Sequence, residues 1–154
     1  MKYAIIVILA TIMYATCSCS KGGGSYKTFD KTLEIHLYWG GGMRYASENV
    51  YIRYDSCIRV DMEQGVDRVT KFAMTDELRK QVLDILDQCQ PKSIQQSNKH
   101  YFAHDKATTR VEFKLNGKHD FSASSGSSTE IAEGSRENFR NLWDKLDAFS
   151  RKKK

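Results

Sequence analysis

Apolar and polar positions alternate with a period of two over most of the segment between residues 32 and 74. Such alternation is typical of β-strands that bury one face. Short glycine-containing or polar stretches interrupt it at 40–42, Asp55-Ser56 and Gln64-Gly65, which indicates turns there, and a weaker strand follows over 66–74. The alternating apolar positions are Leu33, Ile35, Leu37, Trp39, Val50, Ile52, Tyr54, Ile58, Val60 and Met62.

Two later segments have the apolar spacing of amphipathic helices. The first opens at Thr75, whose hydroxyl suits an N-cap; two acidic residues follow in its first turn, and Pro91 limits its extension. The second begins after Ser135, the expected N-cap. Their apolar stripes are Leu78, Val82, Ile85, Leu86 and Cys89, and Phe139, Leu142, Trp143, Leu146 and Phe149.

Further strands are expected between these helices, over residues 101–105, 110–115 and 118–123. Asn116-Gly117 indicates a tight hairpin because both residues accept positive φ. The order strands, helix, strands, helix, with short connections, predicts an α+β fold. We expect an antiparallel sheet of about six or seven strands with two amphipathic helices packed on one face.

The first residues of the chain have a different pattern. Met1-Lys2 gives a basic start, residues 3–13 are apolar except for Thr11, and small residues follow. This order is typical of a secretory signal peptide, and the run is shorter than the ~20 apolar residues of a transmembrane helix. We therefore expect a signal peptide over residues 1–18.

Residues 14–19 read Tyr-Ala-Thr-Cys-Ser-Cys and resemble a bacterial lipobox, in which small residues precede a cysteine that is acylated on sulfur after cleavage. Cys19 fits as the acceptor because Ser18 precedes it, and Cys17 is the alternative because Ala15 lies two positions ahead of it. The layout is similar to that of short Bacteroidota lipoproteins of uncharacterised function. This resemblance implies an anchor and brings no activity, and secretion without a lipid is the alternative.

The expected anchor places the folded part of the chain near a membrane. Residues 19–30 comprise the lipidated cysteine and a glycine-rich tether, and ten such residues span about 17 Å on average. A single domain over 31–150 and a basic tail over 151–154 follow. We expect this domain on the outer or periplasmic side of a membrane of the cell envelope.

The net charge of +5 comes from the two ends of the chain. Lys2 and the four residues 151–154 are basic, and without them 19 basic residues balance 19 acidic ones. The body is therefore neutral, and it lacks the surplus positive charge that a nucleic-acid-binding surface needs. The tail suits the negative end of a helix dipole; contact with anionic lipid is the alternative.

Two cysteines lie beyond the lipobox, Cys57 and Cys89. Outside the cytoplasm they can oxidise, so we expect a Cys57–Cys89 disulfide, with two separate buried thiols as the alternative. Neither cysteine lies in a CxxC motif, so the sequence does not indicate a catalytic thiol.

The histidines offer a second kind of chemistry. His100 and His104 are four residues apart, and His119 lies on a neighbouring hairpin. The flanking pattern predicts a strand and no glutamate base lies between the first two, so a metal site there is only an alternative. GxSxG and phosphate-binding motifs are lacking. We expect no metal or cofactor; the alternative function is a small envelope hydrolase that uses these histidines.

Tyr38, Tyr51 and Tyr101 occupy strand positions whose parity is opposite to that of the apolar set. Exposed tyrosines on a sheet suit recognition of a protein, peptide or glycan, although tyrosine is also common in strands by propensity alone. The sequence therefore favours a non-catalytic binding or interaction domain, with the membrane contacted through the lipid anchor.

Overall fold

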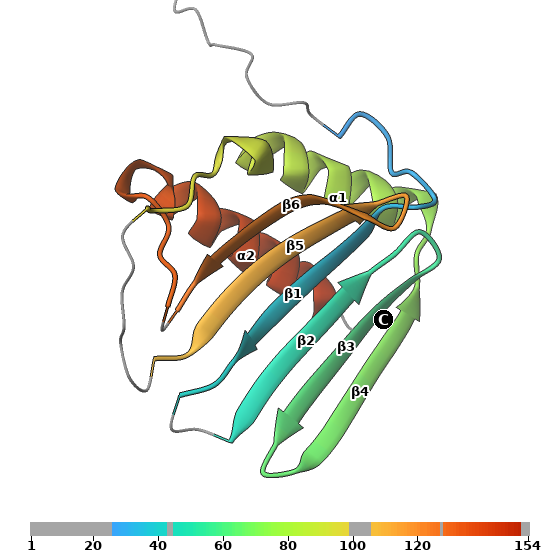
Figure 1. Cartoon of the computed structure of the whole chain (residues 1–154). Coiled ribbons are helices and arrows are strands. Elements are labelled where there is room, and N and C mark those ends of the chain that lie inside the picture. The colour runs from blue at the N-terminus through green and yellow to red at the C-terminus, as the bar shows by residue number, and fades with distance from the viewer. Residues whose placement is uncertain (1–25, 43–44, 99–105, 127, 152–154) are drawn as a thin grey trace, which may run out of the picture.

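The computed structural model describes residues 26–42, 45–98, 106–126 and 128–151. Within them, six antiparallel strands form one sheet in the order β4-β3-β2-β1-β5-β6, and both α-helices cover the same face (Figure 1). The predicted α+β fold is confirmed. The strands are β1 Glu34–Gly40, β2 Ala46–Ile52, β3 Ser56–Glu63, β4 Val66–Ala73, β5 Thr108–Leu115 and β6 Lys118–Ser125. The helices are α1 Asp76–Cys89 and α2 Arg136–Ser150. A single 3₁₀ turn, η1 Pro91–Ser93, follows α1, and another, η2 Glu133–Ser135, precedes α2.

The tight turns form where the sequence predicts them. Gln64 and Gly65 have φ values of 52° and 80°, and Asn116 and Gly117 have 53° and 72°. Positive φ at both central residues matches the right-handed twist of the flanking strands, so these pairs close the β3–β4 and β5–β6 hairpins. The expected strand over 101–105 lies outside the described residues.

The helices begin as expected, with one difference in capping. The Thr75 hydroxyl accepts a hydrogen bond from Leu78 N at 3.2 Å. Ser135 precedes α2, but its hydroxyl accepts from Gln95 N at 3.1 Å and caps no helical N–H. Of the helices described, none is long and apolar enough to cross a membrane.

The hydrophobic core fills the space between the sheet and the two helices. Both predicted helix stripes contribute to it, and Phe149 of α2 packs edge-on against Phe72 of β4 with 5.9 Å between ring centroids. The largest fully buried side chains are Phe113, Phe149, Leu33, Ile35, Leu37, Ile52, Leu86, Leu142, Leu146, Val50, Val82 and Val111.

The packed domain begins earlier than residue 31, the boundary that the sequence suggests. Phe29 is buried, and the Tyr26 ring packs edge-on against Phe113 with 5.4 Å between centroids. The Tyr26 hydroxyl donates to Asp120 at 2.5 Å, and Lys92 lies over the ring. Residues 26–30, which the sequence assigns to the expected tether, therefore belong to the packed domain, because two of their aromatic side chains pack against it.

The apolar side chains of strand β3 point away from the helices, whereas their alternation along the sequence suggests that they point towards the core. Cys57 and Arg59 pair with the buried residues Ile52 and Val50 of β2, so they point towards the helices. Because successive side chains alternate between faces, the apolar residues of β3 point to the other side. Those residues are Ile58, Val60 and Met62.

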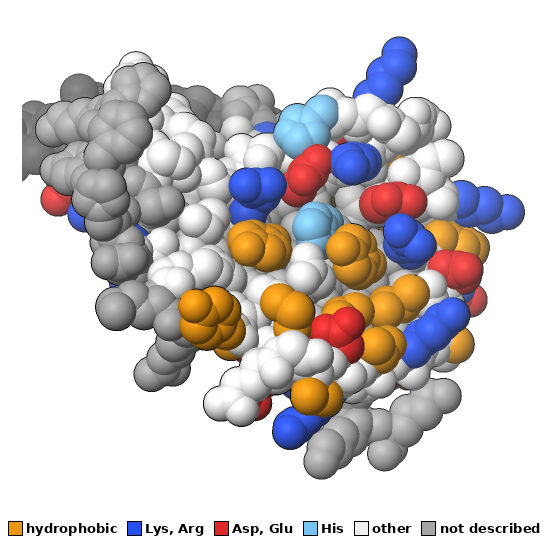
Figure 2. Space-filling model, turned by 60° about the horizontal axis from the view of Figure 1, so that its bottom comes forward, with side chains coloured by type: hydrophobic (Ala, Val, Ile, Leu, Met, Phe, Trp, Pro, Cys, Tyr) orange, Lys and Arg blue, Asp and Glu red, His pale blue; other side chains and the backbone are white. Residues whose placement is uncertain are grey.

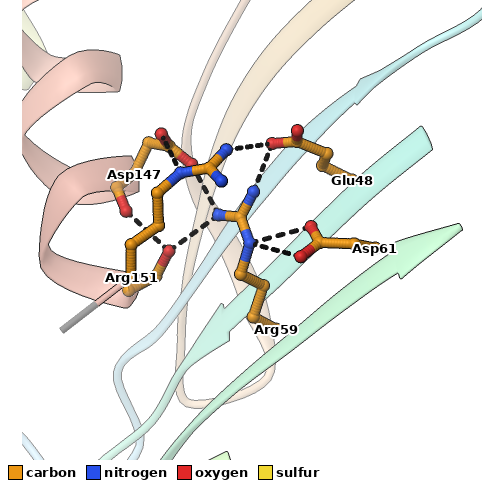
Figure 3. A network of polar contacts seen from close by, with 6 residues as sticks. Glu48, Arg59, Asp61, Asp147 and Arg151 are labelled. Atoms are coloured by element: carbon orange, nitrogen blue, oxygen red, sulfur yellow. Dashed lines mark hydrogen bonds and ion pairs between the residues drawn. The ribbon is translucent and has the colours of Figure 1, made fainter. Parts of the chain in front are cut away.

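Arg59 is buried on the helix-covered side of the sheet, where it takes part in a network of ion pairs (Figure 3). Its side chain is 3% exposed; its Nε lies 2.8 Å and 2.9 Å from the two Asp61 oxygens. Nη1 of Arg59 donates a hydrogen bond to Asp147 of α2 at 2.6 Å, and Nη2 donates one to Glu48 of β2 at 2.5 Å. Arg151 bridges Glu48 and Asp147 at 2.9 Å each. The network therefore joins β2 and β3 to the end of α2.

Candidate functional site

The sheet face that the helices leave uncovered is called the open face here, and Figure 2 shows it. Hydrophobic side chains gather in a band on this face, and charged and histidine side chains lie beside the band. Tyr38 of β1 and Tyr51 of β2 both lie on the open face, half-buried among their neighbours. Tyr101 lies outside the described residues.

Two aromatic rings form the centre of the open face. The ring of His36 stacks on the ring of Tyr51, with 4.5 Å between centroids and 3° between planes. Nε2 of His36 lies 3.1 Å from Oδ1 of Asn49, and this hydrogen bond orients the imidazole ring. The Arg53 guanidinium lies 5.7 Å from the Tyr51 centroid. These contacts come from β1, β2 and the turn after β2, so the sheet register holds the rings in place.

Charged residues of β5 and β6 border these rings. Arg110 pairs with Tyr38 across the sheet, and its guanidinium lies 5.9 Å from the Tyr38 centroid. Glu112 pairs with His36, and its carboxylate lies 3.0 Å from Nδ1 of His119. A hollow of about 140 Å³ lies here. It is lined by Glu34, Ile35, His36, Tyr51, Arg53, Glu112 and Lys114.

The other half of the open face carries a row of apolar side chains. Ile58 pairs with Tyr51, and Val60 pairs with Asn49 on one side and with Val69 of β4 on the other. Val69 is 64% exposed. An apolar band therefore continues from the two tyrosines to the edge of the sheet, and adjacent exposed apolar side chains of this kind mark interaction surfaces.

A larger cavity of about 520 Å³ lies beside the start of α2. Its charged rim includes Glu130, which pairs with Lys106 and Arg136 at 3.5 Å each. The lining residues are Lys106, Thr109, Ser125, Glu130, Ile131, Arg136, Phe139, Arg140, Trp143 and Asp144.

The cavity explains a wrong expectation about the tryptophans. Both residues lie on the apolar faces that the sequence indicates, which predicts that Trp39 and Trp143 are buried, but both are only half-buried. Trp143 lines the cavity, so part of its ring meets solvent. Trp39 pairs with Thr109, another lining residue, at the end of β1. Periodicity identifies the inward face of an element but not where the covering layer ends.

The structure corrects the expected Cys57–Cys89 disulfide, because both cysteines are free buried thiols. The start of α1 lies beside the β2–β3 turn, where Met74 N donates to Asp55 O and Arg79 donates to Tyr54 O. Cys89 ends the helix, roughly 20 Å along its axis at 1.5 Å per residue, whereas a disulfide requires Cα atoms within about 7 Å. Burial raises the pKa of Cys57 to about 12, although Arg59 lowers it, and burial raises that of Cys89.

The remaining predicted site residues are not brought together in the described part of the chain. His100, His104, Cys17 and Cys19 lie outside the described residues. His119 contacts only Glu112 among the ion pairs of the described residues. No group of three or more histidine, cysteine or acidic side chains with the geometry of a metal site occurs among the described residues.

Sequence reasoning missed His36 as part of the open-face cluster. Its parity is the same as that of Tyr38, which was the available signal. The stacking partner depends on the register between β1 and β2, which alternation alone does not define.

No protein-family model matches the chain, and no curated protein sequence matches it.

Proposed function

We propose that this chain is an exported lipoprotein, anchored through Cys19, whose domain binds a protein partner at the cell envelope with its open face. The reversed orientation of β3 is the observation that carries the proposal. This strand buries Arg59 and places Ile58 and Val60 on the solvent side of the sheet. Burying a guanidinium with three carboxylates does not maximise stability, whereas an apolar open face suits binding.

The chemistry of the open face favours a protein over a glycan. Sugars bind by stacking on free aromatic ring faces, but the Tyr51 ring already contacts His36 and Arg53. The Tyr38 ring contacts Arg110. Tyrosine and arginine next to an apolar patch are the residues enriched at protein interfaces, where a few of them supply most of the binding free energy.

The position of Tyr26 is compatible with an anchor that leaves the open face accessible. Tyr26 packs against Phe113, which is fully buried and pairs with the buried Ile35, so the Phe113 side chain points to the helix-covered side of the sheet. A tether that joins the domain there enters from the side opposite to the open face. Confinement near the membrane also raises the effective concentration of the domain towards other anchored proteins.

The anchor is tested by acylation of the full chain in an exporting bacterium. Mass spectrometry should find the lipid on Cys19, and the chain should sediment with membranes and resist extraction by salt. Cys19→Ala should release it, whereas Cys17→Ala should not. Unchanged acylation of Cys19→Ala would assign the lipid to Cys17, and no acylation of the wild-type chain would favour secretion.

Binding is tested by affinity recovery from detergent-solubilised envelopes with the full chain as bait. The Tyr38→Ala/Tyr51→Ala double variant should recover at least about tenfold less of the wild-type partner. Tyr45→Ala is the matched control, because Tyr45 is 90% exposed and lies before β2, outside the stacked cluster. Equal recovery by all three proteins would contradict binding through the open face.

The hydrolase alternative remains a prediction tied to His100 and His104. It requires that His100→Ala or His104→Ala remove a hydrolytic activity of the wild-type chain. The binding proposal expects partner recovery by both variants to equal that of the wild-type chain.

A further inference from the structure

Strand β4 combines an unpaired edge with exposed apolar side chains. Three of the four exposed large apolar residues among those described lie on the β3–β4 hairpin: Met62 at 40%, Val66 at 62% and Val69 at 64% exposure. β4 pairs with β3 on one side, and no described strand pairs with its other side. An unpaired strand edge is a template for pairing with another chain.

The opposite edge of the sheet is covered, which sets β4 apart. At β6, the amide of Gln96 accepts from Ser124 N at 2.8 Å and donates to Ser124 O at 3.0 Å. This side chain therefore takes the place of a neighbouring strand. Asp120 of β6 is held by Tyr26 and Lys92. Within the described part of the chain, no comparable contact reaches the outer side of β4.

The backbone groups available on β4 follow from the turn that precedes it. In an antiparallel pair, hydrogen-bonded and non-hydrogen-bonded residue pairs alternate, and the residues flanking a two-residue turn form a hydrogen-bonded pair. Counted from Glu63 and Val66, which flank the turn, this alternation directs the N–H and C=O groups of Asp67, Val69 and Lys71 away from β3. The side chains of these three residues lie on the open face.

The side chains of β4 are complementary to those of a second, antiparallel β4. If Val69 of one copy lies opposite Val69 of the other, Asp67 of each copy lies opposite Lys71 of the other. On the helix side of the sheet, Val66 then lies opposite Phe72. We propose that two copies of this chain pair in this register through β4, so that the partner recognised at this edge is the chain itself.

Residues within the chain do not otherwise explain this charge pattern. The cross-strand partners of Asp67 and Lys71 on β3 are the apolar residues Met62 and Ile58, and neither charged residue has an ion pair among the described residues. Charges placed only to protect an edge from pairing need no such antiparallel symmetry. Opposite charges in directly opposed cross-strand positions, by contrast, stabilise one register.

The pairing joins two sheets into one and extends the apolar band. Val60 and Val69 of one copy meet Val69 and Val60 of the other in a single cross-strand row. The two-fold axis is perpendicular to the sheet, so both open faces point the same way. This inference is independent of the proposed function, since it concerns the edge of the sheet and not the partner of its open face.

Charge reversal in the full chain tests the register. Sedimentation velocity in a density-matched detergent should show a concentration-dependent dimer of the wild-type chain. Asp67→Lys and Lys71→Asp each place like charges in opposed positions twice per dimer, and each should raise the dissociation constant about tenfold or more. The Asp67→Lys/Lys71→Asp double variant restores both opposed pairs and should return to within about threefold of wild type.

The rescue separates pairing from misfolding, because the exposed single variants should keep the wild-type melting temperature at concentrations where all the proteins are monomeric. A wild-type chain that is monomeric at all concentrations would overturn the proposal. The β4 edge would then either bind a different partner or stay unpaired. A dimer that neither single reversal weakens, or that the double variant fails to restore, would overturn it as well. Partner recovery by the Tyr38→Ala/Tyr51→Ala variant reports on the open face separately, because neither tyrosine lies on β4.

Discussion

The imidazole of His36 lies flat against the phenol ring of Tyr51, with 4.5 Å between centroids and 3° between planes. The two residues are direct cross-strand partners in β1 and β2, so the stack forms because the register places them opposite each other. The pair defines the centre of the open face, where the rings and the apolar band meet.

The stack should contribute a small, measurable amount to stability. His36→Ala removes the stacking partner of Tyr51 and should lower the free energy of unfolding by about 0.5–1 kcal/mol in urea titrations, whereas His36→Phe should recover most of it. His119→Ala is the control, since that side chain is 57% exposed and should cost less than about 0.5 kcal/mol. A larger loss for His119→Ala than for His36→Ala would contradict the importance of the stack.

Arg59 should be the most sensitive charged residue of the domain. Arg59→Met leaves Asp61 without its cation and leaves Glu48 and Asp147 with Arg151 alone. It should cost roughly 2–4 kcal/mol, since these carboxylates remain partly solvated. Arg53→Met is the matched control. Arg53 and its partner Glu34 are 45% and 49% exposed, so its loss should cost under about 0.5 kcal/mol. Equal melting temperatures for the two variants would refute the structural role of the network.

The same network should make stability depend on pH in the acidic range. Burial raises the pKa of Asp147, but hydrogen bonds from Arg151 and Arg59 outweigh burial and lower that pKa below 3.8. Because the folded-state pKa is depressed, the stabilisation from Asp147 is complete above the unfolded pKa of ~3.9 and is lost as pH falls through the folded value. The stability difference between wild type and Asp147→Asn should therefore be constant above about pH 5 and shrink as the pH falls from there through the folded-state pKa of Asp147. Parallel stability curves for the two proteins would contradict this.

The two buried thiols should be unreactive in the native protein. Cys57 is 0% and Cys89 3% exposed, and burial raises the pKa of both. Alkylation of the native chain, mapped by peptide mass, should leave both cysteines unmodified, and urea should expose both. A disulfide-linked peptide that joins Cys57 to Cys89 would be the opposite result and would restore the pairing that the sequence suggests.

The secondary structure could be predicted from local patterns because those patterns have local causes. Thr75 caps α1, the pairs at Gln64 and Asn116 accept positive φ, and the helix stripes have a clear period. Each signal lies within a few residues of the element that it defines, so no knowledge of the tertiary structure is needed.

The orientation of β3 could not be predicted in this way. Its apolar alternation suggests that Ile58 and Val60 are buried, but the pairing with β2 places Cys57 and Arg59 inside. That choice depends on carboxylates distant in the sequence, above all Asp147, 88 residues from Arg59. The cysteine pairing was wrong for a related reason, because the sequence does not show that the whole length of α1 separates the two thiols.

In vivo photo-crosslinking from the open face tests the central claim most directly. A photoreactive amino acid at Ile58 of the full chain lies beside Tyr51 in the apolar band, and one at Lys80 on the exposed side of α1 is the control. The proposed function predicts a discrete adduct with an envelope protein, distinct in mass from a dimer of the chain, from Ile58 and not from Lys80. The absence of an adduct at Ile58, or the same adduct from both positions, would contradict a binding role for the open face.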